Sequence, residues 1–121
     1  MIAIRHDLSP ASLTARIDAL FELSGRKILA IERSWKPEAG TPVFTVEGRY
    51  TSRGWTEWTQ GFQFGSALLQ FEASRDERFL DIGLDGTLGR MASHVSHVGV
   101  HDHGFNVVST YGNLLRLGRE G

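Results

Sequence analysis

The feature that most constrains the fold is a long helical pattern near the start of the chain. It begins at Ser9 and Pro10, a serine followed by a proline, which is typical of an N-cap and the first residue of a helix. Apolar residues then recur at helical spacing, namely Leu13, Ile17, Leu20, Phe21, Ile28 and Ile31. We therefore predict one helix from about Pro10 to Ser34, with Gly25 as its weak point or break.

The next segment has a different pattern. Residues 36–42 read as a loop, and residues 42–53 alternate enough to indicate a short strand or extended segment. Thr56 or Thr59 is then expected to cap a second helix that ends near Ser74. The apolar residues of this second helix are Phe62, Phe64, Leu68, Leu69 and Phe71.

Two further helices are expected downstream. Asp76 is the predicted N-cap of a third helix, whose apolar positions are Phe79, Leu80, Leu84, Leu88 and Met91. A histidine-rich loop follows, and a fourth helix starts near Phe105. The residues expected to face inward are Val108, Tyr111 and Leu115, with Leu114 as a further candidate. The predicted fold class is all-α, with one short extended or β segment around residues 42–53.

Length and composition exclude several classes of protein. The 121 residues suit one small domain, 1–121, and the net charge of −1 offers no basic surface for a nucleic acid. No cysteine is present, so disulfides and thiolate zinc sites are excluded. No signal-peptide pattern and no membrane-spanning apolar run occurs. We expect a cytoplasmic protein that contacts neither nucleic acid nor membrane and needs no cofactor.

The stretch "HVSHVGVHDHGFN" contains four of the five histidines. Histidine is both a common metal ligand and a side chain that titrates near neutral pH, so the stretch is compatible with a metal site or a catalytic one. The candidate metal ligands are His94, His97, His101, Asp102 and His103. No standard zinc motif such as HExxH occurs, and we assign no metal ligand. Asp102 is also suited to be the cap of the following helix.

The stretch "WTEWTQGFQFG" places Trp55 and Trp58 at the start of the second helix. Indole faces are good platforms for sugar rings, because they combine apolar area with a polarised π face. The alternative is that both tryptophans simply pack at a helix entry. No GxSxG motif, P-loop or dinucleotide fingerprint is present, so neither a nucleophilic serine nor a phosphate cradle is indicated.

Together, two stretches resemble a known family. "WTQGFQFGSALLQFEASRDERFL" resembles the Trp-Thr, Gly-Phe, Gly segment and the following apolar helix of the unsaturated glucuronyl hydrolases. "HDHGF" resembles the His-Asp-x-Gly-Phe motif of the same family, in the right order and at a plausible distance downstream. The resemblance covers roughly residues 55 to 117, about half of the chain. The pair of motifs is much more specific than either motif alone.

The resemblance implies a six-hairpin glycosidase fold, an (α/α)6 barrel. It also implies hydration of a vinyl ether: an acid protonates the C4=C5 bond of an unsaturated uronic acid, and water adds at C5. The resulting hemiketal collapses and releases the sugar. By resemblance, Asp102 is the first of two catalytic aspartates, His101 precedes it in the motif, and Trp58 lies near the sugar. We take His101, Trp58 and its neighbour Trp55 as substrate-binding residues.

The sequence departs from the family in length. The second aspartate and further uronate contacts of the family lie beyond the sequence given, and a barrel of roughly twelve helices needs about three times this length. We therefore expect about the first third of a barrel, with little or no turnover by itself. Its apolar helix faces would be exposed, which predicts a homo-oligomer or association with the rest of a barrel. Two other hypotheses are a non-catalytic helical oligomer or carbohydrate-binding remnant, and a His-rich metal-binding domain.

Overall fold

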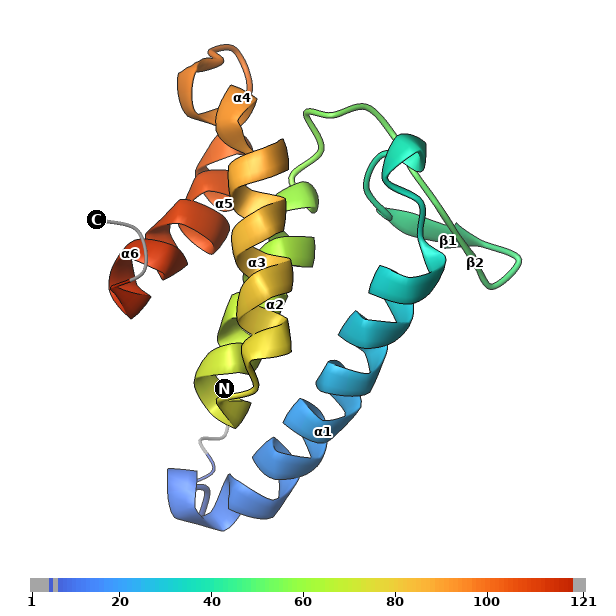
Figure 1. Ribbon diagram of the computed structural model, residues 1–121. Coiled ribbons are helices and arrows are strands. Elements are labelled where there is room, and N and C mark those ends of the chain that lie inside the picture. Colours follow the sequence, from blue (N-terminus) through green and yellow to red (C-terminus); the bar gives the residue numbers. More distant parts are fainter. Residues whose placement is uncertain (1–4, 6, 119–121) are drawn as a thin grey trace.

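The computed structural model describes residue 5 and residues 7–118. This part of the chain is mostly helical and carries one small antiparallel sheet (Figure 1). The elements, in chain order, are α1 (Pro10–Ser34), the 3₁₀ turn η1 (Pro37–Ala39), β1 (Phe44–Val46), β2 (Arg49–Thr51), α2 (Gln60–Ser74), α3 (Glu77–Arg90), α4 (Ala92–Ser96), α5 (His103–Val107), the π-helical turn η2 (Val108–Gly112) and α6 (Asn113–Leu117).

Helix α2 is the central element. It packs against α1, against α3, and against the continuous helical run of α5, η2 and α6. This last run goes in the same direction as α2, whereas α1 and α3 go in the opposite direction (Figure 1). The helices therefore alternate in direction along the chain, and the starts of α2 and α5 lie at the same end of the molecule.

Helix α1 has the bounds predicted from the sequence. Ser9 and Ser12 form a reciprocal capping box, and Pro10 is the first helical residue. The expected break at Gly25 is wrong, because the helix continues through it. Gly25 is the only buried residue of α1, and a Cβ there would lie 3.2 Å from the ring of Phe79 and 3.2 Å from the amide of Gln70. This glycine permits close packing of α1 on its neighbours.

The extended segment predicted around residues 42–53 is a two-stranded hairpin. Phe44 pairs with Thr51, and Val46 pairs with Arg49. The turn residues Glu47 and Gly48 both have positive φ, 50° and 75°. Positive φ at both turn positions is the geometry of a type I′ turn, whose twist matches that of the flanking strands.

The cap predictions for α2 and α3 have different outcomes. Asp76 caps α3 as predicted, and its carboxylate accepts a hydrogen bond from the backbone N–H of Arg78 at 3.1 Å. Thr59 occupies the N-cap position of α2, but its side chain makes no capping hydrogen bond, and its hydroxyl is buried without a partner. Helix α2 is instead held at its start by long-range contacts, described below.

The last helical run has a largely different inward face from the one predicted, and of the candidates only Leu114 is buried. Its buried residues are His103, Asn106, Thr110 and Leu114. Val108 and Leu115, which we expected to face inward, are 69% and 67% exposed. The inward face is therefore mostly polar, and a search for apolar periodicity selects the wrong side of such a helix.

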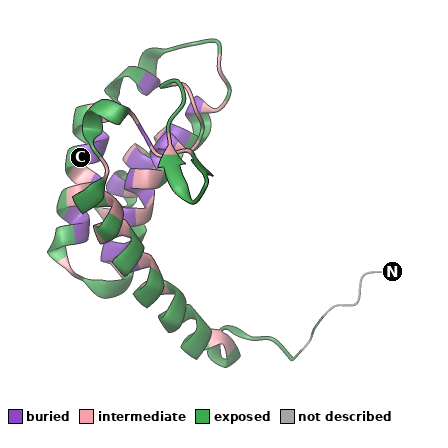
Figure 2. Cartoon of the chain, turned by 90° about the vertical axis from the view of Figure 1, so that its right-hand side faces the viewer, coloured by how far each residue is buried: buried purple, intermediate pink, exposed green. Residues whose placement is uncertain are grey.

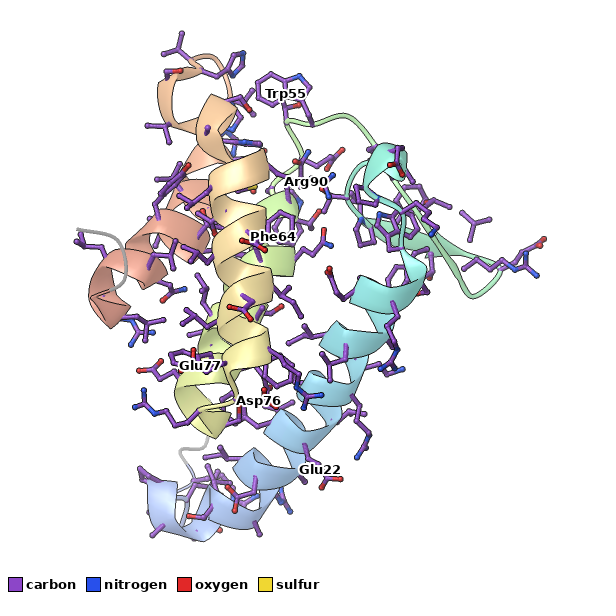
Figure 3. The ribbon with its side chains drawn as sticks, in the orientation of Figure 1. Glu22, Trp55, Phe64, Asp76, Glu77 and Arg90 are labelled. Atoms are coloured by element: carbon purple, nitrogen blue, oxygen red, sulfur yellow. The ribbon has the colours of Figure 1, made fainter. Side chains whose placement is uncertain are left out.

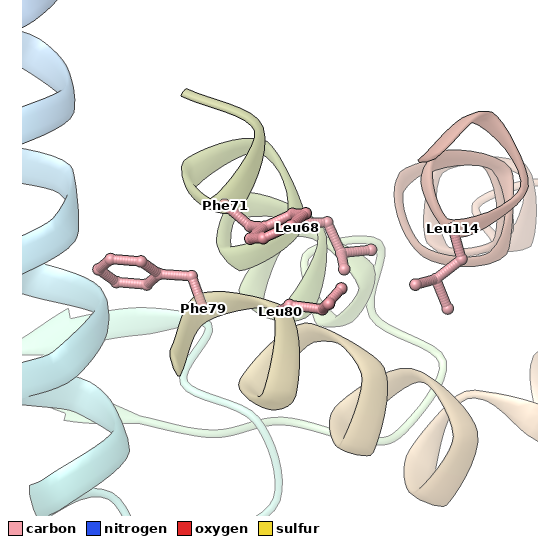
Figure 4. Close-up of a cluster of buried hydrophobic side chains, with 5 residues drawn as sticks. All are labelled: Leu68, Phe71, Phe79, Leu80 and Leu114. Carbon is pink, nitrogen blue, oxygen red and sulfur yellow. The ribbon is translucent and has the colours of Figure 1, made fainter. Parts of the chain in front are cut away.

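The apolar core lies between α2, α3 and α6. Its buried members are Leu68, Phe71, Phe79, Leu80 and Leu114 (Figure 4). The outer surfaces are less well covered, and most of α1 is exposed (Figure 2). Large apolar side chains remain open to solvent on α1, such as Leu20 at 61%, and on the last helical run, such as Phe105 at 52%. No helix in the described residues is long and apolar enough to cross a membrane.

Candidate ligand site where two helices begin

The two stretches singled out in the sequence meet in the structure through one buried side chain, Asn106. Its carbonyl oxygen accepts a hydrogen bond from the backbone N–H of Gly61 at 2.7 Å, and its amide nitrogen donates to the backbone carbonyl of Glu57 at 3.2 Å. Asn106 is fully buried. A Cβ on Gly61 would lie only 2.5 Å from the Cα of Asn106, so glycine is required for this approach. The start of α2 is thus fastened to α5.

Trp58 lies beside this joint and is 45% exposed. Its ring makes edge contacts with Phe62, at 5.3 Å between centroids, and with Phe105, at 6.3 Å. Phe105 follows Asp102 by one helical turn. Trp58 is therefore part of an exposed aromatic group at the same end as Asp102, which leaves ring area available to a ligand.

Trp55 packs against three histidines. Its ring stacks on that of His103, with centroids 5.7 Å apart and an interplanar angle of 21°. It meets His94 and His97 edge-on, at 5.3 and 4.9 Å. We call Trp55, His94, His97 and His103 the histidine cluster. The predicted loop from His94 is only partly right, because His94 lies in the short helix α4 and His103 is the first residue of α5.

The hydrogen bonds of the histidine cluster define its protonation. Nε2 of buried His94 lies 2.9 Å from the backbone carbonyl of Trp55, and a carbonyl can only accept, so His94 carries a proton on Nε2. Nδ1 of His97 lies 2.7 Å from Nε2 of His103, and one of the two must donate. Burial, together with the neighbouring His94 and His97, holds the pKa of His103 below its ordinary value, although Asp102 acts in the opposite direction. His103 is neutral at pH 7.

Asp102 lies in the turn before α5 and is partly exposed. Although it occupies the N-cap position, its side chain makes no capping hydrogen bond, so the cap interpretation is wrong. Its carboxylate lies 3.2 Å from Nε2 of His101, whose own side chain is 90% exposed. The only side-chain partner of Asp102 among the described residues is thus a surface imidazole, and the side chain of Asp102 itself is 26% exposed.

The structure does not favour the metal hypothesis. In residues 5 and 7–118, no group of three or more histidine or carboxylate side chains has an arrangement that could hold a metal ion. The imidazoles of the histidine cluster are turned toward one another and toward Trp55 instead.

Comparison with protein-family models, with curated proteins and with solved structures finds no match for this chain.

Sequence reasoning missed Asn106. It was not selected because it lies in a helix and belongs to no catalytic or ligand-binding pattern. The available signal was its position: Asn106 and Thr110 are spaced by four residues on the side of the helix that also carries Leu114. Polar residues at that spacing indicate a buried hydrogen-bonded face when an apolar residue continues the same side.

Proposed function

We propose that this chain is the ligand-binding end of a six-hairpin glycosidase-like protein related to the unsaturated glucuronyl hydrolases. The observation that carries the proposal is the joint made by Asn106. Asn106 directly follows the HDHGF stretch, and its side chain accepts a hydrogen bond from the backbone N–H of Gly61, 45 residues earlier, in the other stretch that resembles the family. Their packing puts Asp102, Trp58 and Trp55 at the same end of the molecule, where one sugar ligand could contact them.

The order of the helices also supports this proposal. In an (α/α)6 barrel, inner helices run parallel and each is preceded by an antiparallel outer helix. Here α2 and the run of α5, η2 and α6 lie side by side in one direction, with α1 and α3 in the other (Figure 1). We propose α2 and the last run as inner helices, and α1 and α3 as outer helices.

In the proposed reaction, Trp58 stacks on the unsaturated ring and Asp102 is one of the two active carboxyl groups. The second carboxyl group, which by resemblance transfers the proton to the vinyl ether, has no counterpart in this sequence. General acid catalysis by a positioned group contributes about 10²–10⁴-fold in rate. The chain alone should therefore bind an unsaturated uronic-acid disaccharide without consuming it.

A binding experiment tests the proposal. Titration of the purified chain with an unsaturated uronic-acid disaccharide, followed by calorimetry, should give saturable binding. Trp58→Ala should weaken disaccharide binding roughly tenfold, because an aromatic contact contributes about 1–1.5 kcal/mol to binding and about 1.4 kcal/mol corresponds to a factor of ten. Trp35→Ala is the matched control, because Trp35 packs on Tyr50, away from Asp102. No saturable binding by the unmodified chain would contradict the proposal.

The role of Asp102 needs a catalytically complete protein. In a full-length relative, replacing the aspartate that corresponds to Asp102 by Asn should abolish turnover, because Asn cannot carry the charge or exchange the proton. Loss of the 4,5-double bond can be followed by its ultraviolet absorbance. Near-normal turnover of that variant would remove Asp102 from the reaction.

A second candidate function is a non-catalytic helical oligomer or carbohydrate-binding protein. It is favoured by the exposed apolar side chains on α1 and on the last helical run. Native mass spectrometry combined with the disaccharide titration tests the first form of this candidate: a discrete homo-oligomer that binds no disaccharide supports a non-catalytic helical oligomer.

A further inference from the structure

A cavity next to the histidine cluster shares Trp55 with the proposed sugar site but is otherwise separate from it. It has a volume of about 300 Å³ and lies between the hairpin, the start of α2 and the end of α3. Its charged and polar lining consists chiefly of Arg53, Arg90, Gln60, Ser93 and His94, together with the ring of Trp55. None of the residues that line it is acidic. Figure 3 shows Trp55 and Arg90 close together at this end, with Phe64 below them.

Arg90 is held in place for binding. Its Nη2 donates to the backbone carbonyls of Pro37 at 3.2 Å and Gly40 at 3.1 Å, and its guanidinium lies over the ring of Phe64, 5.7 Å from the centroid. It forms no ion pair within the described part of the chain, although it also borders a neighbouring groove that contains Glu32, Asp81 and Asp85. A fixed guanidinium with donors to spare is the best side chain for an oxyanion, because little entropy is lost on binding.

Arg53 supplies a second cation from the opposite side of the cavity. Its contact with Glu57 is long, 3.8 Å, which is beyond hydrogen-bonding distance. Its guanidinium lies over the ring of Phe44, 4.7 Å from the centroid. The donors of Arg53 can therefore turn to a ligand anion at low cost. Trp55 adds an apolar face to the same lining.

We propose that this cavity binds the oxyanion of a small ligand, a carboxylate or a sulfate, between Arg53 and Arg90. When the oxyanion is attached to a sugar ring, that ring rests against the indole of Trp55. Gln60 and Ser93 offer neutral hydrogen bonds at the edge of the cavity. The site shares Trp55 with the proposed sugar site, but neither Asp102 nor Trp58 lines it.

Calorimetric titration of the full chain tests this site. The probes are sodium sulfate and glucuronic acid, with sodium chloride at equal ionic strength and glucose as controls. We expect saturable binding of at least one of the two anions and none of glucose. Arg53→Met should weaken the binding roughly tenfold or more, because a charge-assisted hydrogen bond contributes at least that factor in affinity. Binding of sulfate or of glucuronic acid identifies which oxyanion the site prefers.

Two variants make the test specific. Arg90→Met should also weaken binding, but it removes the hydrogen bonds that hold the loop at Pro37 as well. Arg53→Met is therefore the decisive variant, because the side chain of Arg53 is exposed and makes no such bonds to any described residue. Arg78→Met is the matched control, because Arg78 lies at the other end of α3 and pairs with Asp76. Absence of saturable binding of both anions, or equal binding by Arg53→Met, would overturn the inference. Asp102→Asn should bind the anion unchanged, which separates this site from the proposed reaction.

Discussion

At the residue scale, His103 is a buried base whose environment favours its neutral form. The groups that face it are His94, His97 and Asp102, and burial lowers its pKa from the ordinary value of 6.5. The unfolded chain therefore binds a proton more readily than the folded chain does below about pH 6.5. The contribution of His103 to stability is complete above that pH and is lost as the pH falls toward the lower pKa of the folded state.

Urea unfolding between pH 7.5 and 5 measures this effect. The free energy of unfolding should decline more steeply below pH 6.5 in the unmodified chain than in His103→Gln, which has no titrating group at this position. His101→Gln is the control, because the side chain of His101 is 90% exposed. Identical pH profiles for the unmodified chain and His103→Gln would show that His103 is not the group responsible.

Asn106 is the residue on which the site geometry depends most. Asn106→Ala removes two hydrogen bonds to the segment that starts α2 and leaves the buried N–H of Gly61 unpaired, whereas the carbonyl of Glu57 keeps its bond from the N–H of Gln60. An unsatisfied buried group costs about 1–3 kcal/mol, so we expect a loss of that order or more in the free energy of unfolding. Asn113→Ala should cost less, because Asn113 bonds only within its own helical run. Equal losses in the free energy of unfolding for the two variants would argue against a special role of Asn106 in fastening α2 to α5.

The sequence predicted the conspicuous residues of this site and missed the buried ones. Trp55, Trp58 and Asp102 were found because aromatic residues and a His-Asp motif stand out and resemble a family. The burial of Asn106 and His103 depends on which side of α5 faces α2, and the spacing of apolar residues does not encode that choice. The absence of a capping bond from Asp102 likewise depends on side-chain orientation.

At the element scale, α2 and α3 are in contact because glycines of α3 face large side chains of α2. A Cβ on Gly86 would lie 2.0 Å from the ring of Phe64, whereas a Cβ on Gly89 meets nothing within 4 Å. Gly86→Ala should therefore lower the free energy of unfolding by about 1–3 kcal/mol through overpacking. Gly89→Ala should raise it by about 0.5–1 kcal/mol, since alanine is the better helix former. Thermal unfolding of the pair checks both signs.

Helix ends were predictable where local chemistry decides them. The side chains of Ser9 and Asp76 each accept a hydrogen bond from a backbone N–H two or three residues ahead, so the starts of α1 and α3 are encoded locally. The last helical run was harder. It contains a π-helical turn, Val108–Gly112, and its inward residues are mostly polar, so neither its geometry nor its buried face follows from apolar spacing.

At the scale of the whole molecule, apolar side chains remain uncovered on two sides. Sedimentation velocity at increasing concentration should reveal self-association of the chain. Leu20→Lys should weaken that association roughly tenfold or more, because burying one leucine contributes about 1.5–3 kcal/mol and a buried lysine opposes it. Arg16→Gln, an exposed change on the same helix, should leave it unchanged. A strictly monomeric chain at high concentration would contradict this expectation.

The alternating helices have a consequence for the shape of any such assembly. Helix α1 and the last helical run, which both carry uncovered apolar side chains, lie at opposite edges of the layer formed by α2 and α3 (Figure 1). These two edges differ in sequence, so pairing one with the other joins copies head to tail. Head-to-tail contacts do not stop at two copies: they close into a ring if the rotation per copy divides a full circle, and otherwise they extend into a filament.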